Sequence, residues 1–135
     1  MTEAVEAKIR VRYAETDAMG VVYHSNHFIW FEVGRVTLMR ELGFPYTDLE
    51  TNGYHLPVVE ARCEYEAPVG FDEVVVIRTT VAPLRNRGLH FRYQAIKEAT
   101  GEVAARGETK HLFVDDSGKV IPIPEAVLEK LPRID

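Results

Sequence analysis

The chain joins a strand-like run to its longest helical pattern through residues 13–24, whose sequence is YAETDAMGVVYH. This segment places a carboxylate, Asp17, and an imidazole, His24, where a strand passes into the start of a helix. A helix start carries unpaired backbone N–H groups and favours nearby negative charge. Together with a carboxylate that acts as base or nucleophile, it is a workable arrangement for attack on a carbonyl group.

The residues before this segment alternate with the period of a β-strand. One face would carry Val5, Ala7, Ile9, Val11 and Tyr13, and the other Glu6, Lys8, Arg10 and Arg12. We therefore predict a first strand whose last inward residue is Tyr13. Gly20 lies in the following loop, where it can adopt backbone angles closed to other residues or let a ligand approach closely.

A helix is predicted from His24 or Ser25 to Leu42, with Ser25 or Asn26 as its N-cap. Gly43 and the proline at position 45 end it. Its apolar residues extend around much of the helix circumference, and we expect them to be buried: Phe28, Ile29, Phe31, Val33, Val36, Leu38, Met39 and Leu42.

After a short helical turn over Tyr46–Thr51, the chain is predicted to form strands at 54–67, 73–84, 89–98 and 102–115. The short connections are rich in turn residues, so the sheet should be mainly antiparallel. Pro124 can begin a small helix over 125–131. One helix and four or more strands after the first strand indicate an α+β domain whose sheet curls around the long helix. Its outer face and edges would then need cover from partner subunits.

Composition narrows the function. A chain of 135 residues is one domain, 1–135, and its net charge of -5 argues against a nucleic-acid-binding surface. Cys63 is the sole cysteine, so no disulfide framework is expected. The acidic N-terminal residues are unlike a signal peptide, and no apolar run is long enough to span a bilayer. We expect a soluble cytoplasmic protein.

Glu15-Thr16-Asp17, Gly20, Val21-Val22 and Tyr23-His24, together with Tyr13, form a specific pattern. This pattern, with the order of elements, resembles the hotdog-fold acyl-CoA thioesterases of the 4-hydroxybenzoyl-CoA thioesterase type, in particular their YbgC-like branch. The resemblance implies a curled sheet around one central helix and hydrolysis of an acyl-CoA without metal or organic cofactor. It also implies a homo-oligomer, dimer or homotetramer, with active sites at the subunit interface.

The resemblance further implies that Asp17 is the catalytic carboxylate, acting on the thioester directly or through water. His24 would orient Asp17 or water, or assist the leaving thiol, and the Tyr13 hydroxyl would reach the carboxylate or the substrate. Gly20, Val22 and Tyr23 would contact substrate. Each residue also has a structural alternative: Asp17 as a loop or capping residue, His24 as a helix-end residue, and Tyr13 as part of a strand.

Two basic residues, Arg85 and Arg87, flank a turn. They are either solvated charges or, as in family members, contacts to the CoA phosphates, sometimes across the subunit interface. His24 and His27 share a helix face, but no third metal ligand accompanies them, so no metal site is predicted. His27 is also a departure, because the family usually has an aromatic residue there, most often Tyr; we expect it to tune the pocket.

Two alternatives to hydrolysis remain open at this level. Hotdog-fold hydratases and dehydratases act on acyl thioesters with acid and base residues at other spacings, and a non-catalytic module would bind acyl-CoA only. Release of free CoA separates hydrolysis from both. The acyl group, whether short aliphatic, long-chain or aromatic, is not determined by the sequence, and neither is the choice between a nucleophilic and a general-base route.

Overall fold

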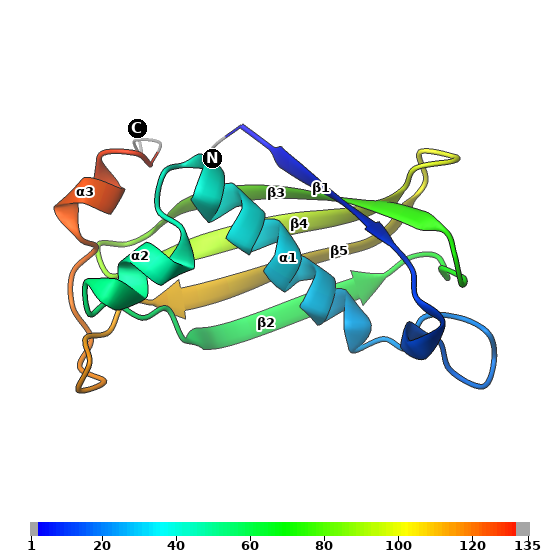
Figure 1. The fold of residues 1–135 in the computed structure, drawn as a ribbon, viewed down its shortest axis with the longest axis horizontal. Helices are drawn as coiled ribbons and strands as arrows, with labels where there is room; N and C mark the ends of the chain where they lie inside the picture. Colours follow the sequence, from blue (N-terminus) through cyan, green and yellow to red (C-terminus); the bar gives the residue numbers. More distant parts are fainter. Residues whose placement is uncertain (1–2, 132–135) are drawn as a thin grey trace.

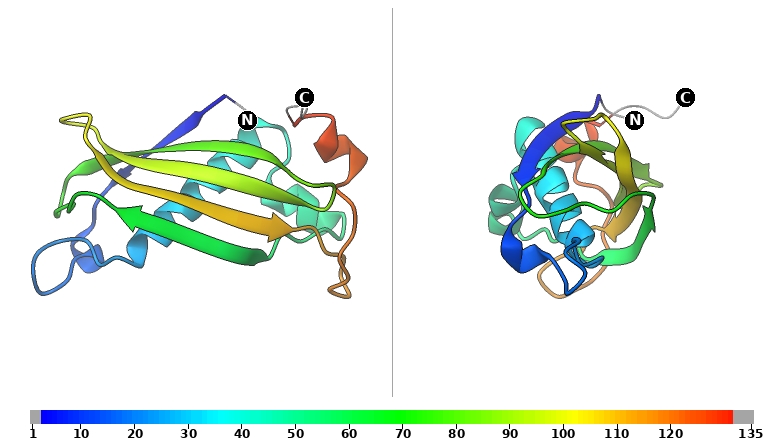
Figure 2. Two further views of the ribbon diagram at one scale, coloured as in Figure 1. Left: turned by 180° about the vertical axis from the view of Figure 1, so that it is seen from behind. Right: turned by 90° about the vertical axis from the view of Figure 1, so that its right-hand side faces the viewer.

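The computed structural model describes residues 3–131, which form a five-stranded antiparallel sheet curled around one long helix (Figure 1). The helices are α1 (Asn26–Glu41), α2 (Tyr46–Thr51) and α3 (Glu125–Leu128), and a 3-10 turn, η1, spans Tyr13–Glu15. The strands are β1 (Val5–Arg10), β2 (Val58–Tyr65), β3 (Val74–Leu84), β4 (Gly88–Lys97) and β5 (Val103–Leu112). The predicted α+β architecture is confirmed, and the end-on view in Figure 2 shows the sheet wrapping around α1.

The order of strands in the sheet is β1-β3-β4-β5-β2, and all four neighbouring pairs are antiparallel. The β3–β4 and β4–β5 hairpins use the short turns predicted from the sequence. β2 instead crosses the sheet to pair with β5, where Cys63 lies opposite Gly107. This crossover leaves β1 and β2 at the two edges.

Small residues let α1 approach the concave face of the sheet closely. A Cβ at Gly34 would collide with the side chains of Ile77 and Thr79 on β3. Gly107 on β5 likewise leaves room for the ring of Phe31, which is fully buried. The central part of α1 is therefore fixed against the sheet, and this sets the position of its first turn.

The first strand is shorter than the alternation predicts, because it ends at Arg10 and the chain then turns into η1. Val11 is still buried, but Tyr13 does not continue the inward face. The side chain of Tyr13 is 76% exposed and its ring lies against Phe71, with 5.5 Å between ring centroids. The prediction that Tyr13 is the last inward residue of the strand is wrong.

Two apolar positions of α1 also differ from prediction. Ile29 and Val33, expected to widen the buried face, are both exposed. The buried residues of α1 are instead His27, Trp30, Phe31, Gly34, Leu38 and Met39. Only one side of the helix meets the sheet, so its opposite side remains open in this chain.

The edge strand β2 is exposed over nearly its whole length. Val58 and Val59 are about half exposed, and one backbone edge of β2 pairs with no strand of residues 3–131. An exposed edge strand with apolar side chains is a template for pairing with another chain.

Candidate active site

The residues after η1 form a closed turn with Asp17 at its base. The Asp17 N–H donates to the carbonyl of Val21 at 2.8 Å, and the Gly20 N–H donates to the carbonyl of Asp17 at 3.0 Å. Gly20 has φ of 80°, a conformation that favours glycine, and a Cβ there would meet no heavy atom within 4 Å. The turn is therefore tight and open above Gly20, as the sequence predicts.

The carboxylate of Asp17 is half-buried and is held by a single hydrogen bond. Its Oδ1 accepts the N–H of Met19 at 2.8 Å. Within residues 3–131 its Oδ2 has no hydrogen-bond or ion-pair partner. One oxygen is thus fixed by the turn, and the other is available to a substrate or to water.

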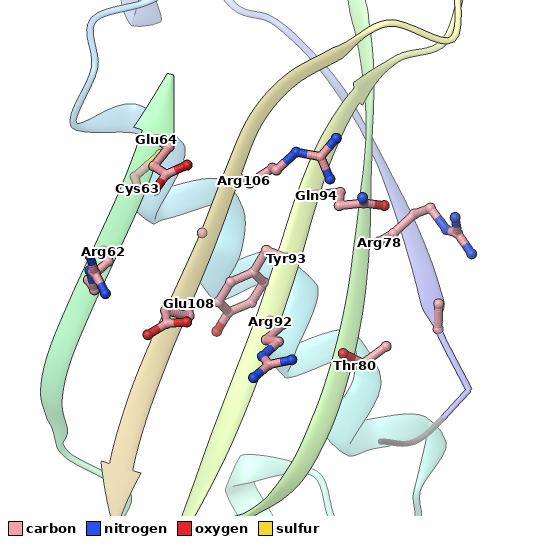
Figure 3. Close-up of a pocket in the computed structure, with 12 residues that line it drawn as sticks. Arg62, Cys63, Glu64, Arg78, Thr80, Arg92, Tyr93, Gln94, Arg106 and Glu108 are labelled. Carbon is pink, nitrogen blue, oxygen red and sulfur yellow. The ribbon is translucent and has the colours of Figure 1, made fainter. Parts of the chain in front are cut away.

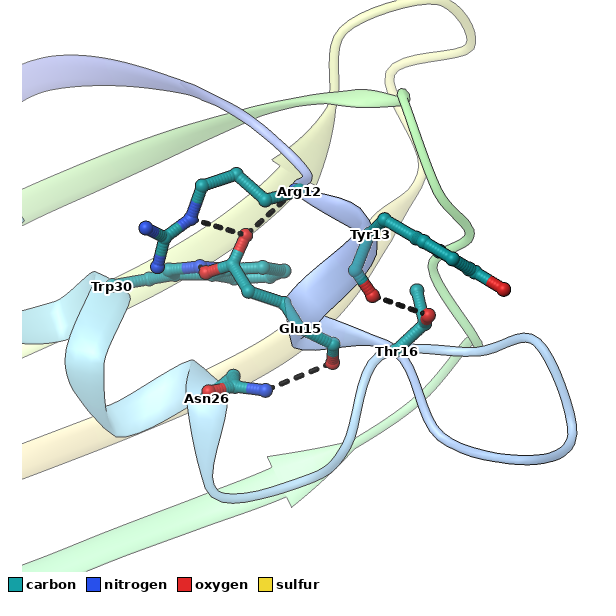
Figure 4. Close-up of polar contacts among 6 residues, drawn as sticks. All are labelled: Arg12, Tyr13, Glu15, Thr16, Asn26 and Trp30. Carbon is teal, nitrogen blue, oxygen red and sulfur yellow. Dashed lines mark hydrogen bonds and ion pairs between the residues drawn. The ribbon is translucent and has the colours of Figure 1, made fainter.

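A second carboxylate, Glu15, lies two residues earlier and is 4% exposed (Figure 4). Its Oε1 accepts the backbone N–H of Arg12 at 2.8 Å, and its Oε2 accepts the indole N–H of Trp30 at 2.8 Å. The Arg12 guanidinium lies 3.5 Å from Oε1. Burial alone would raise the pKa of Glu15, but the hydrogen bonds from Arg12 and Trp30 outweigh it and hold that pKa below its usual value. Both oxygens are occupied, so Glu15 anchors the segment.

The backbone of Glu15 connects this anchor to the start of α1. Its carbonyl accepts the N–H of Tyr23 at 2.9 Å and the side-chain amide of Asn26 at 2.8 Å. Sequence reasoning missed this role of Glu15. The available signal was the single Trp30, because a buried indole N–H usually needs an acceptor.

The first turn of α1 has already used several of its amide groups. The N–H groups of Asn26, His27 and Phe28 donate to the carbonyls three residues earlier, at 2.9 to 3.3 Å. Ser25 occupies the N-cap position without a capping side-chain bond. In the described part of the chain, the N–H groups of His24 and Ser25 have no acceptor. The candidate oxyanion donors at this helix start are therefore these two amides.

The side chain of His24 is exposed, and its ring lies 4.4 Å from the ring of Tyr23. The hydroxyl of Tyr65, at the end of β2, donates to the His24 carbonyl at 2.9 Å. Burial, with the Cys63 thiol adjacent, raises the pKa of Tyr65 to about 12, so this hydroxyl is a donor at neutral pH. The end of β2 is thereby tied to the helix start.

A family model described as the thioesterase-like superfamily matches residues 11–131. The chain belongs to this superfamily. It is 31% identical over 107 residues to the acyl-CoA thioester hydrolase YbgC of Escherichia coli O157:H7, with 79% of each protein covered.

Solved structures agree with this assignment. The Thermus thermophilus protein TT1821 is 41% identical, with a TM-score of 0.88 over 93% of this chain and 95% of the other. The gentisyl-coenzyme A thioesterase BH1999 is 32% identical, with a TM-score of 0.84 over 92% of this chain and 99% of the other. The hotdog fold and membership in a family of acyl-CoA thioesterases, both expected from the resemblance of segment 13–24 and the order of elements, are confirmed.

Two predicted contact residues of this thioesterase-family chain lie apart from the open surface of the Asp17 turn. Val22 is 7% exposed, and its side chain belongs to the core. The hydroxyl of Tyr13 forms no hydrogen bond with the described residues, and Figure 4 shows the ring directed away from Glu15. Gly20, Tyr23 and His24 are exposed, and the rings of Tyr23 and His24 are in contact.

Arg85 and Arg87 lie at the opposite end of the sheet from Asp17. They occupy the β3–β4 turn, whereas Arg10, just before η1, pairs with the first residue of β3. β3 spans 11 residues, so about 30 Å of strand separates the two ends. Both arginines line a cavity of about 410 Å³ with Leu84, Leu112 and Val120. Within one chain they cannot meet a small group bound at Asp17.

A larger cavity, of about 440 Å³, lies on the outer face of the sheet, and Figure 3 shows α1 behind the strands that form it. Its charged lining residues are Arg62, Glu64, Arg78, Arg92, Arg106 and Glu108. Arg62 and Glu64 lie on the exposed edge strand β2. Because Asp17 and the start of α1 lie elsewhere, this cavity is separate from the candidate active site.

Within residues 3–131 no group of three or more His, Cys, Asp and Glu side chains could hold a metal ion. His24 and His27 have different surroundings, since His24 is exposed and His27 is 4% exposed. None of the helices in this range is long and apolar enough to cross a membrane.

Proposed function

We propose that this protein hydrolyses acyl-CoA thioesters to the free acid and CoA, with Asp17 as the catalytic carboxylate. The proposal rests on the burial and the hydrogen bonding of the Asp17 carboxylate. It is a half-buried carboxylate with one oxygen held by the Met19 N–H and the other without a partner among residues 3–131, in a turn that leads directly to a helix start. Family membership and the similarity to an acyl-CoA thioester hydrolase support the choice of thioester as substrate.

The thioester carbonyl would lie above Gly20, with its oxygen toward the N–H groups of His24 and Ser25. In one route Asp17 Oδ2 attacks the carbonyl carbon, the C–S bond breaks, and CoA leaves as its thiol; water then hydrolyses the resulting mixed anhydride. In the other route Asp17 takes a proton from the water that attacks the carbonyl, and collapse of the tetrahedral intermediate breaks the C–S bond and releases CoA, protonated as its thiol. Both routes place negative charge on the carbonyl oxygen, which the two amides stabilise.

His24 and Tyr23 are exposed, with 4.4 Å between their ring centroids, and are the side chains proposed to contact the substrate beside Asp17. The His24 imidazole would orient water or give a proton to the leaving thiol. The Tyr13 hydroxyl would join them only if its ring left Phe71. Val22 would act through its backbone, which pairs with Thr16 and holds the turn closed.

We further propose that two copies complete each site. The free edge of β2 and the exposed Ile29 and Val33 on α1 offer apolar surface to another copy. Arg85 and Arg87 lie too far from Asp17 to serve it within one chain, so they would hold the CoA phosphates of a neighbouring site. A dimer or tetramer by light scattering is expected, and a monomer would contradict this arrangement.

The function is tested by following free thiol release from a set of acyl-CoAs. The similarity to a gentisyl-coenzyme A thioesterase supports including aromatic acyl groups, and short and long aliphatic acyl-CoAs complete the set. Wild-type protein should release CoA, and Asp17→Asn should release it at least about 100-fold more slowly. Thioester consumption without free thiol would indicate hydration, and binding without consumption would indicate a non-catalytic module; either result would reject hydrolysis.

The phosphate role of the arginines has its own test. Arg87→Ala should raise KM for an acyl-CoA and leave KM for the matching pantetheine thioester unchanged, because that thioester lacks the nucleotide phosphates. Equal effects on both substrates would reject the role.

A further inference from the structure

The peptide unit between His24 and Ser25 connects the edge strand β2 to the proposed oxyanion site. Its carbonyl, on His24, accepts the hydroxyl of Tyr65 at 2.9 Å. Its N–H, on Ser25, has no acceptor within residues 3–131. Because a peptide unit is planar and trans, its C=O and N–H point in opposite directions. A group that fixes the carbonyl of His24 therefore also fixes the direction of the Ser25 N–H.

The carbonyl of His24 does not need the Tyr65 hydroxyl to be paired. A helix start lacks partners for its N–H groups, whereas its carbonyls accept N–H groups from the next turn. The carbonyl of His24 already accepts the N–H of His27 at 3.3 Å. The shorter of its two hydrogen bonds nevertheless comes from Tyr65, which is 41 positions away in the sequence. This second bond is therefore better explained by what it does to the peptide unit than by satisfaction of a carbonyl.

Tyr65 is well placed to hold this peptide unit. It is the last residue of β2, and Figure 1 shows this end of the strand beside the start of α1. Its side chain is 46% exposed, and its ring meets the rings of His24 and His27 edge to face. Partial burial, with the Cys63 thiol adjacent, raises the pKa of Tyr65 to about 12. At neutral pH the hydroxyl therefore donates a hydrogen bond and keeps its proton.

We propose that Tyr65 is a positioning residue for hydrolysis, because its hydrogen bond to the carbonyl of His24 orients and polarises the Ser25 N–H that faces the oxyanion. The inference rests on the proposed function and deepens it. The hydroxyl acts through the peptide unit and does not touch the substrate. When negative charge develops on the thioester oxygen, the Ser25 N–H binds it more strongly, and Tyr65 stabilises the charge displaced onto the carbonyl of His24. Hydrogen bonds linked in this way strengthen one another.

The other candidate oxyanion amide provides a comparison within the site. The N–H of His24 belongs to the preceding peptide unit, whose carbonyl, on Tyr23, accepts the N–H of Asn26 at 2.9 Å. No side chain of residues 3–131 donates to that carbonyl. Loss of a whole oxyanion donor slows catalysis by about 100- to 1000-fold. Tyr65 supports one of two donors from a distance of one peptide unit, so loss of its hydroxyl should cost less, about 10-fold.

Tyr65→Phe tests the proposal, since it removes the hydroxyl and keeps the ring. The substrate is benzoyl-CoA or hexanoyl-CoA, whichever the wild type hydrolyses faster. We expect kcat to fall about 10-fold and KM to change less than about two-fold, because the oxyanion exists only in the transition state. The melting temperature should fall by no more than about 5 °C, and the mass by light scattering should equal that of wild type.

Three results with Tyr65→Phe would overturn the proposal. A raised KM with unchanged kcat would mean that the hydroxyl binds the substrate directly. Wild-type kcat and KM with a lowered melting temperature would mean that the bond only stabilises the fold. A changed mass would mean that the variant acts through assembly of the chains at the β2 edge.

Tyr54→Phe is a matched control at the opposite end of β2. Tyr54 is also partly buried and precedes the strand, so about 25 Å of strand separates it from Tyr65 and the helix start. Its kcat should stay within about two-fold of wild type. If Tyr54→Phe lowered kcat as much as Tyr65→Phe does, the effect would belong to β2 as a whole, and the specific role of Tyr65 would be rejected.

Infrared spectroscopy reports the oxyanion site directly. Asp17→Asn is mixed with the same acyl-CoA carrying ¹³C at the thioester carbonyl, and the frequency of the bound C=O stretch is measured. Adding Tyr65→Phe should raise this frequency, because a less polarised Ser25 N–H draws less charge onto the oxygen, whereas adding Tyr54→Phe should leave it in place. The same frequency in all three proteins would overturn the proposal.

The inference and the proposed function fail in different ways. Wild-type turnover in Tyr65→Phe, together with slow turnover in Asp17→Asn, would reject only the role of Tyr65. Absence of thiol release from every acyl-CoA would reject the function itself.

Discussion

The turn at residues 12–16 and the turn at residues 17–21 each contain one carboxylate, and they use it in opposite ways. Glu15 is buried and accepts hydrogen bonds at both oxygens, from Arg12 and Trp30. Asp17 is half-buried and has one oxygen held by Met19. The comparison teaches that the number of bonds already made decides the role. A fully bonded carboxylate stabilises the fold, and a partly bonded one remains available for chemistry.

The largest expected effect comes from Asp17→Asn. Loss of the charge removes the nucleophile or base, so kcat should fall at least about 100-fold, which corresponds to about 2.7 kcal/mol of activation free energy. The amide oxygen can still accept the Met19 N–H, so the melting temperature should stay within about 2 °C of wild type. Steady-state kinetics measures kcat, and thermal unfolding measures the melting temperature. Near wild-type turnover would contradict the catalytic role of Asp17.

Glu15→Ala should show the reverse pattern, with its main effect on stability. It leaves the buried indole N–H of Trp30 without an acceptor and creates a cavity, so the free energy of unfolding should fall by about 3 kcal/mol. Denaturant unfolding measures this change. Glu15→Gln, which keeps one acceptor oxygen, should lose less. If Glu15→Ala unfolded as wild type does while losing all turnover, the division of roles would be incorrect.

Gly20→Ala tests whether the turn itself positions Asp17. The space around a Cβ is open, so the effect comes from the positive φ alone and should destabilise the protein by about 1–2 kcal/mol. Gly20→Asn should be milder, because Asn tolerates this conformation better. A fall in kcat that follows the loss of stability in the two variants would link turn geometry to catalysis, whereas unchanged stability in both would show that the turn can relax.

The smallest effect is a pH dependence that belongs to Glu15. The pKa of Glu15 in the folded protein lies below the ordinary value of 4.5. The charged carboxylate therefore contributes fully to the free energy of unfolding above about pH 4.5, and this contribution is lost as the pH falls through the pKa of the folded protein. The difference in free energy of unfolding between wild type and Glu15→Gln should shrink below about pH 4.5. Burial also lowers the pKa of His111 to about 4. Because the unfolded chain then protonates this histidine more readily than the folded protein does, the free energy of unfolding of both proteins falls as the pH is lowered from about 6.5 to about 4. That contribution cancels in the difference, and a constant difference down to pH 2 would contradict the lowered pKa of Glu15.

Much of the local structure was predictable because it depends on neighbours in the sequence. The prediction placed α1, α2 and the β3–β4–β5 hairpins within a few residues of their observed ends. It used the period of the apolar residues, the helix end at Gly43 and the turn-forming residues between strands. The residue pattern from Tyr13 to His24, together with the order of elements, resembled the family to which the chain belongs. The prediction that Tyr13 is the last inward residue of the first strand was wrong, because strand periodicity does not show where a strand ends and a 3-10 turn begins.

The amino-acid sequence thus determined the helix, the strands and the chemistry-bearing turn, since each rests on backbone preferences and hydrogen bonds within a few residues. The tertiary structure alone decided which groups are free. It showed that β2 crosses to β5 and leaves an edge, and that Arg85 and Arg87 lie at the far end of the sheet. It also showed that the nitrogens of the buried His27 ring have no hydrogen-bond partner within residues 3–131. These facts depend on contacts between residues distant in the chain, and periodicity carries no information about such pairing.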